Sequence, residues 1–227
     1  MKIHSIAIDG PAGAGKSTIA KAVSSHLSYI YVDTGAMYRA VAFFVLRNDI
    51  HPDDEEAISK IYNQIDIKLD YVDKEQQIYL NGENVSIIIR SEEVGNAAST
   101  VSKHLIIREK MVELQQIIAT KTSVVMDGRD IGTVVLPKAD LKIYLTASAK
   151  ERAKRRYLDL KNKGIDGDID KIKEDIIARD NQDMNRENSP LVKAKDAIEI
   201  DSSNMSIEEV VSLILKLFKE KVDMNEN

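Results

Sequence analysis

The stretch from Gly10 to Ser17, GPAGAGKS, combines the residue types that hold a phosphate group. It fits the pattern G-x-x-x-x-G-K-[ST] at every specified position. In such a loop the glycines let backbone N–H groups converge on a phosphate, and the positive end of the following helix faces the same anion. Lys16 is expected to reach the β- and γ-phosphates, and the Ser17 hydroxyl is expected to bind Mg²⁺. A tight surface turn is the alternative, but an apolar run over residues 3–8 and a helical pattern after the loop favour a nucleoside triphosphate site.

Two groups of charged residues lie at spacings that place each group on one face of a helix. The first consists of Arg152, Arg155 and Arg156, and the second of Arg179, Asp183 and Arg186. Their spacings are i, i+3, i+4 and i, i+4, i+7. The planar guanidinium fork suits bidentate capture of phosphate or carboxylate. Either group alone could be a solvated helix face, but beside a phosphate loop both favour phosphate clamps.

Acidic residues end two predicted strands. Asp33 closes the β-rich run that begins at Tyr29, and Asp127 closes SVVMD and opens DGRDIG, residues 127–132. Open α/β sheets bind ligands outside the carboxyl ends of their strands. A plain Asp–Gly turn is the alternative for DGRDIG, but its position and charge density favour a binding site.

The periodicity of the chain places these residues on an α/β fold. Strands and helices alternate at the N-terminus, where residues 29–33 and 34–48 follow the first strand and helix, so a parallel sheet is expected. The sequences SAKE and SIEE form capping boxes that start two of the later helices. The other predicted elements are strands at residues 123–127, 141–146 and 197–201, a turn at 163–168, and helices at 105–119, from 148, at 171–185 and from 206.

An antiparallel pattern interrupts this order between residues 61 and 101. IDIKLD, residues 65–70, alternates apolar and polar residues, and QQIYLNGENV, residues 76–85, contains an Asn-Gly hairpin signal. A helix is expected near residues 91–102. The pattern predicts a small inserted subdomain.

Composition limits the classes of function. The chain has 227 residues, of which 43% are hydrophobic and 30% charged, as expected for one soluble domain. It has no cysteine, which excludes disulfides, thiolate metal sites and a cysteine nucleophile. The net charge of −5 disfavours a nucleic-acid polymer as a partner. The longest apolar stretch, residues 40–46, is too short to span a membrane, and the N-terminus has no signal-peptide pattern, so a cytoplasmic protein is expected.

The chain does not match a GTPase switch. Such a protein carries N-K-x-D and D-x-x-G, whereas the nearest match, NKGID at residues 162–166, is one residue too long, and no aspartate has a glycine three residues later. A non-catalytic nucleotide-binding module remains an alternative, although it would have no use for DGRDIG. Another small P-loop kinase is the alternative within the enzyme class.

Five blocks of the sequence, taken in order, resemble those of bacterial cytidylate kinases in the P-loop nucleoside monophosphate kinase family: IDGPAGAGKST, DTGAMYRA, EVGNAAS, DGRDIGTVV and RDNQDMNR. The resemblance covers nearly the whole chain, and the later blocks are more specific than the phosphate loop. It implies an α/β fold with a P-loop NTPase-type parallel sheet flanked by helices, a small inserted NMP-binding subdomain and a helical lid. The expected division of this single domain, 1–227, is a core of 1–60, 102–147 and 187–227, an insert of 61–101, and a lid with its adjoining helix of 148–186.

The resemblance implies that the γ-phosphoryl group of ATP is transferred to CMP or dCMP, giving ADP and CDP or dCDP, in pyrimidine nucleotide metabolism with Mg²⁺. The expected partners are these small molecules, and a monomer is expected. The catalytic residues are expected to be Lys16, Asp127, Arg129, Arg152, Arg156 and Arg186. The ATP site is expected to comprise Gly10, Pro11, Ala12, Gly13, Ala14, Gly15, Lys16, Ser17, Thr18 and Arg155, with Ser17 as the metal ligand.

The resemblance also assigns the acceptor site, to which Asp33 and Thr34 belong. The residues expected at or near the acceptor phosphate are Arg39, Arg129 and Arg186. Those expected at the cytosine are Ser99, Arg108 and Asp130, and those at the sugar are Arg179 and Asp183. Close relatives can carry Ser at the position of Thr34 and Gly at that of Ser17, so the family can do without the Ser17 hydroxyl.

This chemistry needs no general base. The phosphate of a nucleoside monophosphate has a second pKa near ~6, so its oxygen is already a nucleophile at neutral pH. Phosphoryl transfer depends mainly on positioning and on cancellation of charge by Lys, Arg and Mg²⁺. A carboxylate such as Asp130 can accept a hydrogen bond from the cytosine amino group. Uracil would instead turn a carbonyl oxygen toward the carboxylate, so that two hydrogen-bond acceptors would face each other. A preference for CMP over UMP is therefore expected.

Overall fold

A parallel sheet forms the centre of the computed structural model, which describes residues 2–72, 75–162 and 164–226. Its strand order is β2-β6-β1-β7-β8. Helices bury both faces of the sheet, which explains why strands such as SIAID and VVMDG lack an exposed polar face. The strands are β1 (Ser5–Asp9), β2 (Ile30–Asp33), β6 (Val124–Gly128), β7 (Leu141–Thr146) and β8 (Ile198–Asp201). The predicted α/β class is confirmed.

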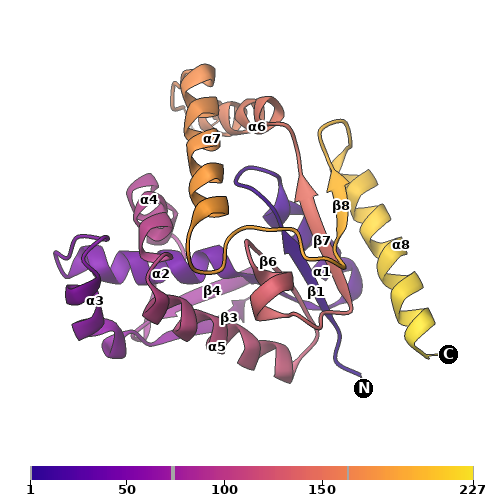
Figure 1. Cartoon of the computed structure of the whole chain (residues 1–227), viewed down its shortest axis with the longest axis horizontal. Helices are drawn as coiled ribbons and strands as arrows, with labels where there is room; N and C mark the ends of the chain where they lie inside the picture. The colour runs from indigo at the N-terminus through magenta and orange to yellow at the C-terminus, as the bar shows by residue number, and fades with distance from the viewer. Residues whose placement is uncertain (1, 73–74, 163, 227) are drawn as a thin grey trace.

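Alternate residues of β1 serve the two faces of the sheet. Ile6 and Ile8 belong to one hydrophobic cluster, and Ala7 belongs to the other. Figure 1 shows the helices on either side of the sheet. Those of the first cluster are α1 (Lys16–Leu27) and α8 (Ile207–Glu226), and those of the second are α2 (Thr34–Arg47), α4 (Glu92–Val101) and α5 (Leu105–Lys121).

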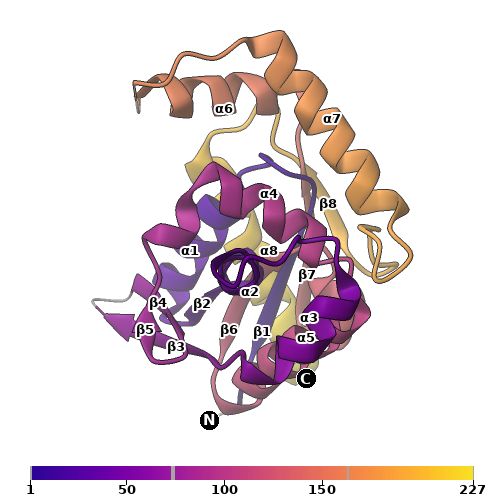
Figure 2. The same cartoon turned by 90° about the vertical axis from the view of Figure 1, so that its left-hand side faces the viewer.

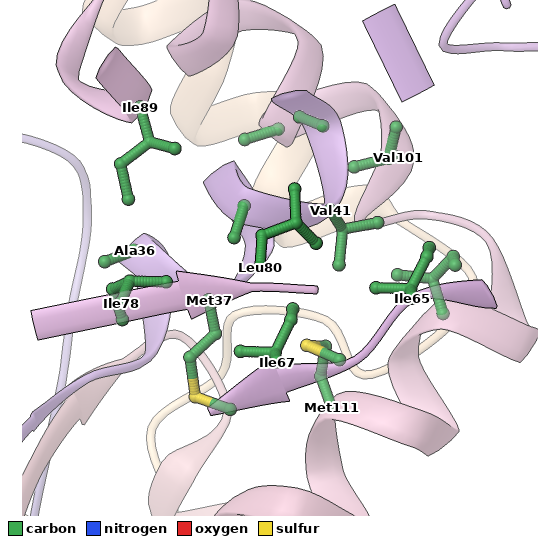
Figure 3. Close-up of a cluster of buried hydrophobic side chains, with 14 of the residues drawn as sticks. Ala36, Met37, Val41, Ile65, Ile67, Ile78, Leu80, Ile89, Val101 and Met111 are labelled. Carbon is green, nitrogen blue, oxygen red and sulfur yellow. The ribbon is translucent and has the colours of Figure 1, made fainter. Parts of the chain in front are cut away.

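The antiparallel segment forms a second, smaller sheet. Asn81 and Gly82 have φ values of 51° and 84°, the left-handed conformations that a tight hairpin turn needs. The strands are β3 (Ile67–Val72), β4 (Glu75–Leu80) and β5 (Glu83–Asn84). Figure 3 shows Ile67, Ile78 and Leu80 close to Met37 of α2. The small sheet therefore shares the core of the main sheet.

Two polar helices, α6 (Ala149–Asn162) and α7 (Ile169–Asn185), lie beyond the carboxyl ends of the parallel strands (Figures 1 and 2). The α7 helix begins two residues earlier than predicted, because the Asp168 side chain accepts a hydrogen bond from the Asp170 amide at 2.9 Å. The predicted turn at 163–168 begins at Lys163, which lies outside the described residues.

The two predicted capping boxes differ. At Ser206 both hydrogen bonds form, since the Ser206 amide donates to Glu209 and the Glu209 amide donates to the Ser206 hydroxyl. At Ser148 the hydroxyl accepts from the Glu151 amide, but the Ser148 amide donates to the Ser203 hydroxyl instead. The SAKE box is therefore half formed, which corrects the prediction.

A short helix, α3 (Glu55–Ile61), falls where the sequence analysis predicts no element. Within the described part of the chain, no helix combines the length and apolarity needed to cross a membrane.

Candidate active site

The glycine-rich loop links the end of β1 to the start of α1. A Cβ atom at position 10 would lie 2.0 Å from the Leu145 carbonyl oxygen, so only a glycine at this position lets the loop pass β7. Gly15 has a φ of 88° and turns the chain into the first residue of α1, Lys16. The loop therefore faces the positive end of a helix, where an anion is favoured.

Lys16 is almost fully buried beneath this loop. Its ammonium group donates to the Pro11 carbonyl oxygen at 2.8 Å. Burial, together with the nearby Arg129 guanidinium, lowers the pKa of Lys16 to about 7. A phosphate bound in the loop would add the negative charge that favours the protonated amine.

Asp127, the predicted acid at the end of β6, faces the same loop. One of its carboxylate oxygens accepts from the Ser17 hydroxyl at 3.0 Å and the other from the Tyr31 hydroxyl at 2.8 Å. Burial, with repulsion from Asp33, raises the pKa of Asp127 to about 6. Ser17, the predicted metal ligand, therefore lies beside the Asp127 carboxylate. No group of three or more acidic, His or Cys side chains suited to a metal occurs among the described residues.

The start of α2 forms one wall beside this acid. Thr34 donates from its hydroxyl to the Asp127 carbonyl oxygen at 2.7 Å. Asp33 caps the helix by accepting from the Ala36 amide at 2.8 Å, and Arg90 lies 3.5 Å from the Asp33 carboxylate. Arg39 follows one turn further along α2.

The loop after β6, the C-terminal half of α7 and Arg186, which directly follows α7, form a second wall. Arg129 donates to the Asp183 carboxylate at 2.8 Å, and Asp130 pairs with Arg108 and lies 3.8 Å from Arg186. Burial opposes the ionisation of Asp183, but the surrounding guanidinium groups outweigh it and lower the pKa of Asp183. Carboxylates thus hold the arginines of this wall in place.

The cations of this wall exceed the carboxylates that neutralise them. Three buried guanidinium nitrogens, Arg108 Nε, Arg179 Nε and Arg186 Nη2, have no hydrogen-bond partner among the described residues. Burial, with repulsion from Arg129 and Arg39, lowers the pKa of Arg179 to about 10. Such an arrangement attracts an anionic ligand.

The arginines of α6 do not share one environment, although their spacing predicts one face. Arg152 is buried, donates to the Ala12 and Ala147 carbonyl oxygens at 2.9 Å each, and lies 2.6 Å from the Asp180 carboxylate. Arg155 donates to the Ser202 carbonyl oxygen at 2.7 Å. Arg156 is exposed to solvent. Arg152 and Arg155 therefore lie against the phosphate loop and the segment after β8, and Arg156 does not.

Ser99, on α4, is held by α7. The Gln182 side-chain amide donates to the Ser99 hydroxyl at 2.8 Å and lies 3.4 Å from the Ser99 carbonyl oxygen. Because a carbonyl oxygen only accepts, the –NH₂ group of Gln182 must face Ser99. The contact joins the small-sheet side of the site to α7.

The sequence analysis missed several residues of the site. Asp9 and Asp180 lie inside quoted motifs, and Asp9 ends a strand as Asp33 and Asp127 do, a signal that could have found it. Gln182 also lies inside a quoted motif, whereas Arg90 lies in none. No local pattern indicates the contacts of these two residues, because their partners come from distant parts of the chain.

Comparisons with known proteins show the family of the chain. The family described as "Cytidylate kinase" matches residues 6–220. The chain is 55% identical over 226 residues to a cytidylate kinase of Caldicellulosiruptor bescii, covering 100% of both chains. It is 50% identical over 213 residues to a cytidylate kinase of Bacillus cereus, covering 94% of this chain and 95% of the relative. A crystal structure of an uncharacterized protein from Eubacterium ventriosum shares the fold, with a TM-score of 0.54, 15% identity and coverage of 96% of this chain and 99% of that one.

Proposed function

Because the chain belongs to the cytidylate kinase family, we propose that it transfers the γ-phosphoryl group of ATP to CMP and dCMP at the site between the glycine-rich loop and the arginine wall. The protein is an enzyme of the phosphotransferase class, and CMP is its acceptor. We also propose that it phosphorylates dCMP. The roles of the individual residues are proposed below, and the chain is proposed to divide into a core, an inserted subdomain and a lid within the bounds predicted from the sequence.

The observation that carries the assignment of roles is the position of two basic groups at one edge of the sheet. Lys16 and Arg152 lie at the phosphate loop, whereas Arg129 lies on the loop after β6 and Arg186 directly follows α7. Two polyanionic nucleotides repel each other, so an enzyme that joins them needs positive charge on both sides.

The donor side would hold ATP through the loop amides and Lys16. Arg152, fixed between the loop and Asp180, would stabilise charge that develops on the transferred group. The Ser17 and Asp127 oxygens fit Mg²⁺, which prefers hard oxygen ligands and is commonly bound by one or two protein groups plus phosphates. When bound, Mg²⁺ would neutralise negative charge on the phosphates.

The acceptor side would orient CMP. Arg39, Arg129 and Arg186 would bind its phosphate, which is already nucleophilic at neutral pH. Asp130, held by Arg108, would accept from the cytosine amino group, and Ser99 would contact the same base. Because all of these residues come from one chain, the protein would work as a monomer, and we place it in the cytoplasm.

The test is ADP release from ATP and Mg²⁺ with CMP, dCMP, UMP or AMP as acceptor. We expect kcat/KM for CMP to exceed that for UMP by at least ~10-fold, because UMP would leave two acceptors facing each other. Faster turnover with AMP than with CMP would refute the assignment of CMP as the acceptor. Tight nucleotide binding without acceptor-dependent turnover would instead indicate a non-catalytic binding module.

A further inference from the structure

Asp9 is a buried carboxylate that the phosphoryl-transfer scheme leaves without a role. It is the last residue of β1 and only 5% of its surface is exposed. Its two oxygens accept from successive backbone amides, Oδ1 from Ile131 at 2.8 Å and Oδ2 from Gly132 at 2.7 Å. Both bonds reach the segment that follows DGRD.

Asp9 holds this segment at two points. In the parallel ladder it is the partner of Gly128, the last residue of β6. Its side chain holds the chain again at Ile131 and Gly132. The two residues between these points are Arg129 and Asp130, so Asp9 brackets the pair that reaches Asp183, Arg108 and Arg186.

The same residue directly precedes the phosphate loop. Gly10 passes so close to the Leu145 backbone that the start of the loop has little freedom. Asp9 therefore connects the fixed start of the donor loop to the acceptor-binding segment through one short side chain.

We propose that Asp9 is a positioning residue that fixes Arg129 and Asp130 relative to the phosphate loop and thereby sets both the affinity for CMP and the choice of CMP over UMP. The inference rests on the proposed function, in which Asp130 recognises the cytosine and Arg129 the acceptor phosphate. A carboxylate suits the task because it can accept from two amides at once. An asparagine would turn an –NH₂ group toward one of the two N–H groups and release that side of the segment.

The primary test is Asp9→Asn, with steady-state kinetics for CMP, UMP and ATP. We expect KM for CMP to rise at least ~10-fold, because a displaced clamp loses orientation, while KM for ATP stays within ~3-fold of the wild type. The ratio of kcat/KM for CMP to that for UMP should fall at least ~5-fold, since Asp130 would no longer be held against the base.

Asp140→Asn is the matched control. Asp140 accepts from the Ser5 amide at 2.8 Å, so it makes the same kind of bond at the opposite end of the same strand. Its acceptor kinetics and its CMP:UMP ratio should match those of the wild type. A loss of specificity in this variant equal to that in Asp9→Asn would show a general effect of strand-end carboxylates and overturn the proposal.

A second variant, Gly132→Ala, keeps the buried charge. The added Cβ would lie 3.3 Å from Asp9 Oδ2 and 3.2 Å from Lys142 Cδ, which crowds the carboxylate away from the amides. We expect the same changes as in Asp9→Asn, and this variant decides the test if Asp9→Asn does not fold.

The outcomes distinguish failure of the proposed function from failure of the role of Asp9. A wild-type enzyme that does not phosphorylate CMP would refute the proposed function. An active wild type, with wild-type KM for CMP and wild-type CMP:UMP ratios in the folded variants, would refute the role of Asp9. Equal losses for CMP and ATP without a change in base choice would also refute it, because they would indicate a structural role only.

Discussion

At the scale of single residues, Lys16 holds a charge that depends on what the loop binds. Its pKa is lowered to about 7 by burial and by Arg129. Bound phosphates favour the ammonium form and must raise this pKa. Linkage then requires that MgATP binding takes up a proton wherever free Lys16 is largely neutral, that is, above pH 7.

We therefore expect uptake of roughly one proton on MgATP binding at pH 8, measured by titration calorimetry in buffers of different ionisation enthalpy. Lys16→Met should abolish the uptake and lower turnover with every acceptor. Lys21→Met is the control, because Lys21 is an exposed residue of the same helix that pairs with Glu75. Proton release, or uptake that persists in Lys16→Met, would contradict this role.

The residues predicted from sequence were those that lie in contiguous motifs. GPAGAGKS and DGRDIG could be read because each keeps its functional groups within a few residues beside a strand end. The contact of Gln182 with Ser99 joins residues 83 positions apart, and Arg90, which lies in no quoted motif, pairs with the distant Asp33. No local pattern encodes such pairs.

At the scale of elements, the α6–α7 pair depends on an ion pair between buried groups. Asp180 of α7 lies 2.6 Å from Arg152 of α6, which also donates to the phosphate loop. Asp180→Asn would leave Arg152 with carbonyl acceptors but no charged partner, so its guanidinium would be held less firmly. We expect kcat to fall roughly 10-fold and KM for ATP to rise, with KM for CMP nearly unchanged.

Steady-state kinetics with varied ATP and varied CMP would measure this effect. Asp175→Asn is the matched control, because Asp175 is exposed on the same helix. If the two variants have the same kinetics, the ion pair does not position Arg152.

Helical spacing alone did not separate the three arginines of α6. The 3.6-residue period places them near one another, but Arg156 is exposed while Arg152 is buried. The half-formed capping box at Ser148 has a similar cause, since Ser203 takes the amide that Glu151 was expected to bond. In both cases a neighbouring element decides between options that the local sequence leaves open.

At the scale of the whole molecule, the strands and their order gather charge at one edge of the sheet. Asp9 and Asp33 are the last residues of β1 and β2, and Asp127 is the last but one of β6; the three strands are neighbours in the order β2-β6-β1. The short continuous apolar run of each strand predicts a strand that is buried on both faces. The sequence of a single strand does not encode the order of the strands in the sheet. That order brings Asp33 beside Asp127, so that the two acids repel each other.

This cluster should cost stability at neutral pH. Folding raises the pKa of Asp127 from 3.8 to about 6, chiefly through burial. At pH values between these two, the folded state therefore binds a proton that the unfolded state has already lost. The stabilising effect of that proton is complete below about pH 4 and is lost as the pH rises through about 6. Asp127→Asn cannot titrate, so its free energy of unfolding relative to the wild type should increase by about 1 kcal/mol between pH 5 and pH 7. Urea unfolding of both proteins at the two pH values would measure this difference. A constant or decreasing difference would show that Asp127 is not destabilised by burial, whereas an increase with loss of turnover would mean that the site maintains a costly buried charge for catalysis.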